Sequence, residues 1–225
     1  MNLSSRRLFT TAVLWIMAVG TLPLAATGAV AHSASGEAQS NPPVEERPQE
    51  GEPESTPDFD IGQLQLLLKR DHASTADFTE HQYRKVLSRP IESKGRLYFE
   101  PPNIFERRVT VPRAEKYRIE GETLTMETPG HKVRRLSLRS QPLLHGLMLG
   151  FQAVVSGDLD LLAPYYHLAV SGSPEEWRLE LDPTDRELAR RIQKIAVDGR
   201  QGDALHFEVT ERSGDRLVTD IRPRT

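Results

Sequence analysis

The residue types that most often carry catalysis or metal binding are present in this chain, but their spacing specifies no active site. The seven histidines form neither H-x-x-x-H nor H-E-x-x-H, so a helix-borne zinc site is not indicated. Ser156 and Ser171 each precede a glycine, yet neither lies in the G-x-S-x-G turn that exposes a catalytic serine. We expect both to be turn residues.

The acidic pairs are equally unspecific. Asp158 and Asp160 resemble half of a calcium loop without its glycine and terminal glutamate, so we expect Asp158 to cap a helix that starts at Leu159. Glu175 and Glu176 lie in a proline-containing turn, where solvated carboxylates are usual, and no spacing argues for a catalytic pair. The chain has no cysteine and no phosphate-binding glycine pattern. The sequence therefore predicts a protein that is not an enzyme and uses no metal or cofactor.

Charge is distributed unevenly along the chain, although the formal total is only −3. Residues 1–31 carry two arginines and no acid, residues 32–60 carry eight acids and one base, and residues 61–225 carry 26 bases and 24 acids. An acidic insert thus separates two weakly basic parts. Since no segment concentrates positive charge, we expect no nucleic-acid partner.

The N-terminus has the three parts of an export signal. Arg6 and Arg7 precede an uncharged run from Leu8 to Leu24, and small residues then lead to an A-x-A site. We therefore expect residues 1–31 to be a cleavable signal peptide and the mature protein to be periplasmic. The paired arginines also fit twin-arginine export. The alternative, an uncleaved anchor, is less favoured because a spanning helix needs about 20 apolar residues.

Residues 32–58 are rich in proline, glutamate, serine and glycine and contain almost no large apolar side chain. Such a segment buries too little surface to offset the entropy lost on ordering its backbone. We expect a disordered acidic linker. It is either a spacer with a role during export or a tolerated tail.

The remaining residues, 59–225, are expected to form one domain. Residues 60–70 have apolar side chains at helical spacing. From Thr75 to Leu138 the hydrophobic period changes to two, with turn residues between the segments, which predicts an antiparallel meander of about six short strands.

Two helices and four further strands are expected to follow the meander. Residues 143–155 have one apolar helical face, and the short apolar segment 159–166 is interpreted as a second helix. Alternation then resumes at Trp177 and continues to Ile221. The predicted fold class is α+β, an incomplete antiparallel β-barrel formed by a strongly curved sheet whose concave face is covered by helices.

The predicted meander contains motifs that resemble a known family. A G-x-L-x-F segment precedes P-N-x-F, and a later hairpin carries G-x-x-L. Together with the export signal, this pattern resembles the outer-membrane lipoprotein carrier (LolA-like) family over about residues 60–222, and the second half is closer to a divergent branch. The residues that carry the resemblance are Phe78, Glu80, Gly95, Leu97, Phe99, Pro102, Asn103, Phe105, Tyr117, Ile119, Gly121 and Leu124.

The resemblance implies a monomeric carrier that shuttles the acyl chains of lipoproteins, or a related lipid, from the inner to the outer membrane. It also implies two membrane partners, an inner-membrane transporter that releases cargo and an outer-membrane receptor. Pro102, Asn103 and Phe105 match the segment expected to contact such partners. The acyl cavity and its helical lid are assigned to Phe78, Leu97, Phe99, Phe105, Leu143, Leu144, Leu147, Phe151 and Trp177.

One position departs from the family pattern. The family usually has a lid-locking arginine directly before the Pro-Asn pair, and this chain has Pro101 there. Arg107 or Arg108 could replace it from the next strand.

The alternative function is a non-catalytic periplasmic module that senses envelope stress or binds a protein partner on the same fold. A small hydrolase has the least support, since no nucleophile and base can be paired.

Overall fold

The computed structural model describes residues 59–224. The predicted signal peptide, 1–31, and linker, 32–58, lie outside the described residues. The helices of the described part are α2 (Ile61–Leu68), α3 (Pro142–Ser156) and α4 (Arg186–Ala189), with the 3-10 helices η2 (Leu138–Ser140) and η3 (Leu159–Leu162). The strands are β1 (Ser74–Tyr83), β2 (Ile91–Glu100), β3 (Ile104–Val111), β4 (Glu115–Glu120), β5 (Thr123–Glu127), β6 (Arg134–Ser137), β7 (Tyr166–Ser173), β8 (Glu176–Pro183), β9 (Ile192–Arg200), β10 (Asp203–Glu211) and β11 (Arg216–Arg224).

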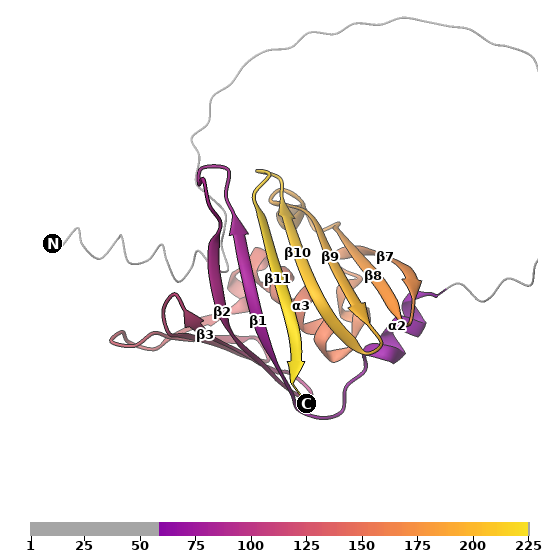
Figure 1. Cartoon of the computed structure of the whole chain (residues 1–225), viewed down its shortest axis with the longest axis horizontal. Coiled ribbons are helices and arrows are strands. Elements are labelled where there is room, and N and C mark those ends of the chain that lie inside the picture. The colour runs from indigo at the N-terminus through magenta and orange to yellow at the C-terminus, as the bar shows by residue number, and fades with distance from the viewer. Residues whose placement is uncertain (1–58, 225) are drawn as a thin grey trace, which may run out of the picture. The chain divides into compact units, whose positions relative to one another are not determined.

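The described strands form one eleven-stranded sheet in the order β6-β5-β4-β3-β2-β1-β11-β10-β9-β8-β7, with α3 behind it (Figure 1). Neighbouring strands are antiparallel throughout. The order ends at β6 and β7, so the sheet is not closed into a barrel. This confirms the predicted incomplete barrel. We call β1–β6 the first half-sheet and β7–β11 the second half-sheet; they meet where β1 pairs with β11.

The predicted helix at 60–70 is confirmed as α2, and its start is encoded by a capping box. Asp60 Oδ1 accepts a hydrogen bond from the Gln63 backbone N–H at 2.8 Å, and Gln63 Oε1 accepts one from the Asp60 N–H at 3.1 Å. Leu64 and Leu68, four residues apart on one face, are buried. The helix therefore begins at a fixed point and turns its apolar side to the domain.

The long helix α3 has clear termini but a weakened interior. Pro142 begins it, and Gly157 ends it in the left-handed conformation at φ 72°. Gly146 and Gly150 lie inside it, and each glycine costs a helix about 1 kcal/mol relative to alanine. At Gly146 the glycine is required, because a Cβ there would lie 2.5 Å from Leu188 Cδ1.

The predicted order of elements is wrong after α3. Of the predicted second helix, 159–166, only Leu159–Leu162 is helical, as η3, and the chain then forms β7. Five strands therefore follow instead of four, and the short helix α4 between β8 and β9 was not predicted. Strand β7 lies at the edge of the sheet and ends in Ser171-Gly172-Ser173. Of its inward positions only Tyr166 is buried, so its alternation is weak. Asp158 occupies the cap position of η3, but its side chain makes no capping hydrogen bond.

The main hydrophobic cluster of the described residues lies between the helices and the second half-sheet. The strand residues of this cluster come from β7–β10. No helix of the described part is long and apolar enough to cross a membrane. The buried members are Leu64, Leu68, Ala153, Val154, Leu159, Leu162, Tyr166, Trp177, Leu179, Leu181, Leu188, Ile192, Ile195, Val197 and Phe207.

Candidate functional site

The first half-sheet carries a continuous apolar row across its concave face. Phe99 of β2 is directly opposite Phe105 of β3, which is opposite Ile119 of β4, which is opposite Leu124 of β5. All four side chains are buried. Since strand residues alternate between faces, their shared register places these side chains on the same side of the sheet. The G-x-L-x-F and P-N-x-F motifs supply half of this row.

A second row runs parallel to the first and contains a charge. Leu97, Arg107, Tyr117 and Met126 are opposite one another on β2 to β5, and all are buried. The concave face of the first half-sheet is therefore apolar with one cationic side chain in its middle.

Glu80 of β1 holds that cation in place. Arg107 Nη1 and Nη2 donate to Glu80 Oε2 and Oε1 at 3.2 and 3.3 Å, and Thr219 Oγ1 donates to Glu80 Oε2 at 3.1 Å. The guanidinium also lies 3.8 Å from the centre of the Phe78 ring. Burial lowers the pKa of Arg107 to about 10, with Glu80 opposing the shift, so the group stays protonated at neutral pH.

Gly95 leaves the space that this arrangement needs. It lies between Phe78 and Val109 in the strand register. A Cβ at Gly95 would lie 1.9 Å from the Arg108 carbonyl oxygen and 2.9 Å from Phe78 Cε1. The motif glycine is therefore explained by close packing of β2 on its neighbours. The ion pair itself was missed from the sequence, although Glu80 and Arg107 both occupy inward positions of the alternation.

A small cavity lies between α3 and the sheet, with a volume of about 60 Å³. Three of the predicted cavity residues line it, namely Leu97, Phe99 and Phe105, and α3 contributes Val154 and Val155. Cavities that hold small molecules are usually about 300–1,000 Å³. In the described arrangement, α3 and the sheet thus leave a partly open space that fits a few water molecules.

Phe151 of α3 bridges the two half-sheets. Its ring centre lies 4.8 Å from that of Phe105 on β3 and 5.1 Å from that of Phe207 on β10. These are favourable separations for tilted aromatic pairs. Phe207 was not among the predicted site residues, because only the pairing of β1 with β11 brings β10 near β3.

The N-terminal part of α3 is fixed to the second half-sheet. Tyr166 of β7 donates its hydroxyl to the Gly146 carbonyl at 3.1 Å, and burial raises the pKa of that phenol. Leu188 of α4 fills the space beside Gly146. Helix α3 is thus anchored on one side and reaches across to Phe105 through Phe151 on the other.

The remaining predicted lid and cavity residues do not line this cavity. Phe78 and Leu144 are buried, whereas Leu143 and Leu147 are half-buried and pack against the main cluster. Trp177 is almost fully buried in that cluster, and its indole N–H donates to the Gln201 carbonyl at 2.8 Å.

The predicted partner segment forms the turn between β2 and β3. Pro102 and Asn103 are exposed there, beside the cavity-lining Phe99 and Phe105. The expected replacement for the missing lid arginine is not found at Arg108, which points to the convex face and contacts Glu106 and the Tyr98 ring.

A different arginine closes the cavity at this end of the sheet. Arg70, in the connection from α2 to β1, donates Nη2 to the Gly202 carbonyl at 2.7 Å and to Asp203 Oδ1 at 2.5 Å. All three residues line the cavity. This clasp joins the chain after α2 to the turn between β9 and β10, and no sequence spacing pointed to it.

Comparisons with known proteins identify the kind of domain. A family model described as "Outer membrane lipoprotein carrier protein LolA-like" matches residues 50–221. Among solved structures, the chain is similar to a LolA superfamily protein from Nitrosomonas europaea, with 16% identity, 73% of this chain and 92% of that chain covered, and a TM-score of 0.38. It is also similar to an outer membrane lipoprotein-sorting protein domain from Vibrio parahaemolyticus, with 15% identity, 75% of this chain and 92% of that chain covered, and a TM-score of 0.42. A third similar structure is the MucA/MucB complex of Pseudomonas aeruginosa, with 11% identity, 73% of this chain and 55% of that chain covered, and a TM-score of 0.40. No curated protein matches the sequence.

Proposed function

The chain belongs to the outer membrane lipoprotein carrier LolA-like family, and we propose that it is a periplasmic carrier that binds acyl chains of lipoproteins, or of a related lipid, between α3 and the concave face of the sheet. It would collect this cargo at the inner membrane and deliver it to the outer membrane without catalysing a reaction. The observation that carries the proposal is the small, partly open cavity under α3, lined by Leu97, Phe99 and Phe105.

The physical basis of binding is removal of the acyl chain from water. Each CH₂ group transferred to an apolar surface contributes about 0.8 kcal/mol. The rows through Leu97 and Phe99 present such a surface over four neighbouring strands. A cavity of about 60 Å³ is too small for an acyl chain, so cargo binding requires α3 to move away from the sheet.

Helix α3 is suited to a hinged movement. Tyr166 and Leu188 hold its beginning at Gly146, and Gly150 weakens the helix between that anchor and Phe151. Withdrawal of the Phe151 ring from between Phe105 and Phe207 would open the face of the first half-sheet to an acyl chain. The lid would then close when the cargo leaves.

Native mass spectrometry of the protein purified from the periplasm tests this proposal. We expect a bound mass that fragments into acyl chains. The variant Phe99→Glu should lose that mass while remaining folded, because the charge reaches water through the cavity. The matched control is Leu66→Glu on α2, whose side chain is 75% exposed and which should keep the lipid.

Two outcomes would overturn the proposal. If Phe99→Glu unfolds the domain, Phe99 belongs to a dry core in which an unpaired charge is not tolerated. If the purified protein carries no lipid but captures a periplasmic protein segment, the partner-binding function is the better description.

A further inference from the structure

Exposed apolar side chains gather at one end of the sheet. Among the described residues, eight large apolar side chains are exposed, and six of them lie in or beside the β1–β2, β3–β4 and β5–β6 connections. Antiparallel strands alternate in direction, so these three connections share one end, which we call the hairpin end. The six residues are Tyr83, Val86, Leu87, Ile91, Val111 and Val133.

The same end is positively charged. The β1–β2 connection, residues 84–90, contains Arg84, Lys85 and Arg89 and no acid. With Arg113, Lys132 and Arg212 of the other tight connections at this end, the basic residues number six against one acid, Asp215. The longer β8–β9 connection, 184–191, adds three arginines and two acids.

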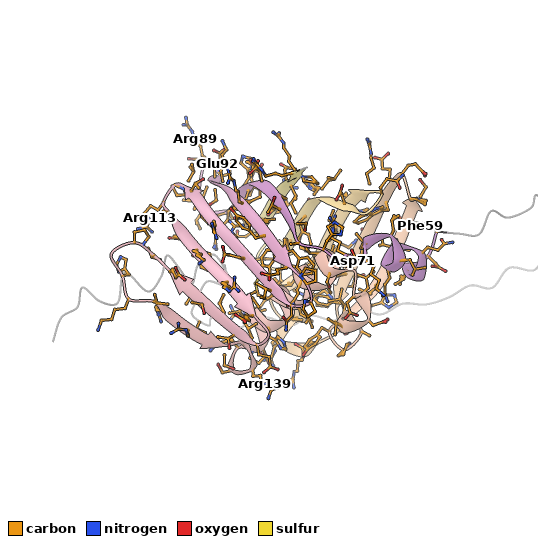
Figure 2. The ribbon with its side chains drawn as sticks, turned by 90° about the horizontal axis from the view of Figure 1, so that it is seen from below. Phe59, Asp71, Arg89, Glu92, Arg113 and Arg139 are labelled. Carbon is orange, nitrogen blue, oxygen red and sulfur yellow. The ribbon has the colours of Figure 1, made fainter. Side chains whose placement is uncertain are left out.

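The tight connections at the opposite end differ in both respects. They comprise residues 101–103, 121–122, 174–175 and 201–202, and they contain no lysine or arginine and two acids. Figure 2 shows Arg89 and Arg113 projecting from the hairpin end and Arg139 on the other side of the molecule. Among the tight connections, positive charge and exposed apolar surface are therefore concentrated at the hairpin end.

We propose that the hairpin end docks on the surface of an anionic phospholipid bilayer, with Val86 and Leu87 entering the headgroup region and Lys85 and Arg89 contacting lipid phosphates. Val86 is 89% exposed at the tip of the hairpin. Apolar side chains flanked by lysine and arginine are the composition that binds anionic interfaces. This inference goes beyond the proposed function and does not depend on the identity of the cargo.

The surroundings of the hairpin fit this orientation. A hollow of about 530 Å³ lies between the β3–β4 and β5–β6 connections, lined by Val109 and Val133 together with the bases Arg108 and Lys116, the acids Glu115 and Glu127, and His131. Since two bases balance two acids in this lining, the hollow adds apolar surface to the hairpin end without adding net negative charge. The β2–β3 turn with the predicted partner residues lies at the opposite end and would face away from the bilayer.

The acids beside the hairpin, Glu92 and Asp215, are both paired with bases. Glu92 is neutralised by Lys94 at 2.8 Å and faces His81 at 3.3 Å. Arg84 is paired with Asp215 at 3.4 Å and holds the hairpin against the β10–β11 turn. Lys85 and Arg89 are therefore the better substitutions for a test, since Arg84 has a structural contact.

Flotation with vesicles tests the docking surface in the full mature protein. We expect binding to vesicles of equal parts phosphatidylglycerol and phosphatidylethanolamine, and little binding to phosphatidylcholine. Substituting Lys85→Gln and Arg89→Gln together should weaken binding about 25-fold, since each charge contributes about fivefold. Val86→Ser with Leu87→Ser should weaken it about tenfold or more.

The control variants carry substitutions of exposed residues away from the hairpin end. Leu66→Ser on α2 removes an equally exposed apolar side chain, and Arg139→Gln removes a charge away from the hairpin end; both should bind as the unchanged protein does. Salt at about 0.5 M should release the protein from the vesicles. Absence of binding to phosphatidylglycerol vesicles at low salt, or equal losses in the hairpin and control variants, would overturn the proposal whether or not the protein carries lipid.

Discussion

The two half-sheets belong to one continuous hydrogen-bonded sheet but pack differently against the helices. In the second half-sheet, strands β7–β10 and all three α-helices contribute to one apolar cluster with fully buried side chains such as Leu179 and Leu181. In the first half-sheet, Leu97, Phe99 and Phe105 line a cavity, and Phe105 meets α3 through Phe151. We propose that the second half-sheet is the fixed support for α3 and that the first presents the face that α3 uncovers.

The buried ion pair belongs to the same contrast. Arg107 and Glu80 lie on the concave face of the first half-sheet, where they are hydrogen-bonded to each other and Glu80 also accepts a hydrogen bond from Thr219. A purely apolar face of this kind would favour collapse onto the helices. A bidentate pair that links β1 to β3 across Gly95 fixes the spacing of those strands. We infer that it keeps the face in shape when α3 moves.

The largest expected effect comes from matched truncations in the two half-sheets. Leu181→Ala in the main cluster should lower the free energy of unfolding by about 3–5 kcal/mol, because it leaves a closed void. Leu97→Ala should cost about 2 kcal/mol, because the removed volume joins an existing cavity. Urea unfolding followed by circular dichroism measures both values. Equal losses would show that the first half-sheet is as solidly packed as the second.

A smaller effect distinguishes the two glycines of α3. Gly146→Ala should destabilise the protein by about 1–3 kcal/mol, because the new methyl group meets Leu188 at 2.5 Å. Gly150→Ala should stabilise it by about 0.5–1 kcal/mol, because its Cβ would lie at an ordinary 3.5 Å from the Tyr166 hydroxyl oxygen.

The same pair of variants also tests the flexibility of the lid. A stiffer helix should bind lipid more slowly, so Gly150→Ala should reduce the rate of lipid uptake while raising the melting temperature. Uptake can be followed with a fluorescent fatty acid by stopped flow. If Gly150→Ala takes up lipid at the original rate, bending of α3 is not part of cargo entry.

The sequence was sufficient for the parts of the fold that depend on local pattern. The period-two alternation predicted β1–β6, and the apolar face of residues 143–155 predicted α3. Leu97, Phe99 and Phe105 lie together as the pattern indicated, because their strands are neighbours in both sequence and space; their role in binding stays a prediction. Strand β7 was missed because an edge strand buries little and its alternation is therefore weak.

Features that depend on distant pairing could not be read from the sequence. Phe207 joins the site only because β11 pairs with β1, and the Arg70 clasp depends on the β9–β10 turn reaching the end of α2. The Glu80–Arg107 pair could not be predicted, because the sequence does not show which inward-facing side chains of β1 and β3 meet diagonally across β2. The size of the cavity is a property of packing that no spacing of residues reports.

The most direct test of the central claim is a distance measurement between α3 and each half-sheet. Because the natural sequence has no cysteine, spin labels can be placed in pairs at Gln152→Cys with Glu100→Cys on β2, and at Gln152→Cys with Gln193→Cys on β9. Electron paramagnetic resonance should show that adding lipid lengthens the distance from α3 to β2 far more than the distance from α3 to β9. Bound lipid with both distances unchanged would contradict a lid that opens over the first half-sheet.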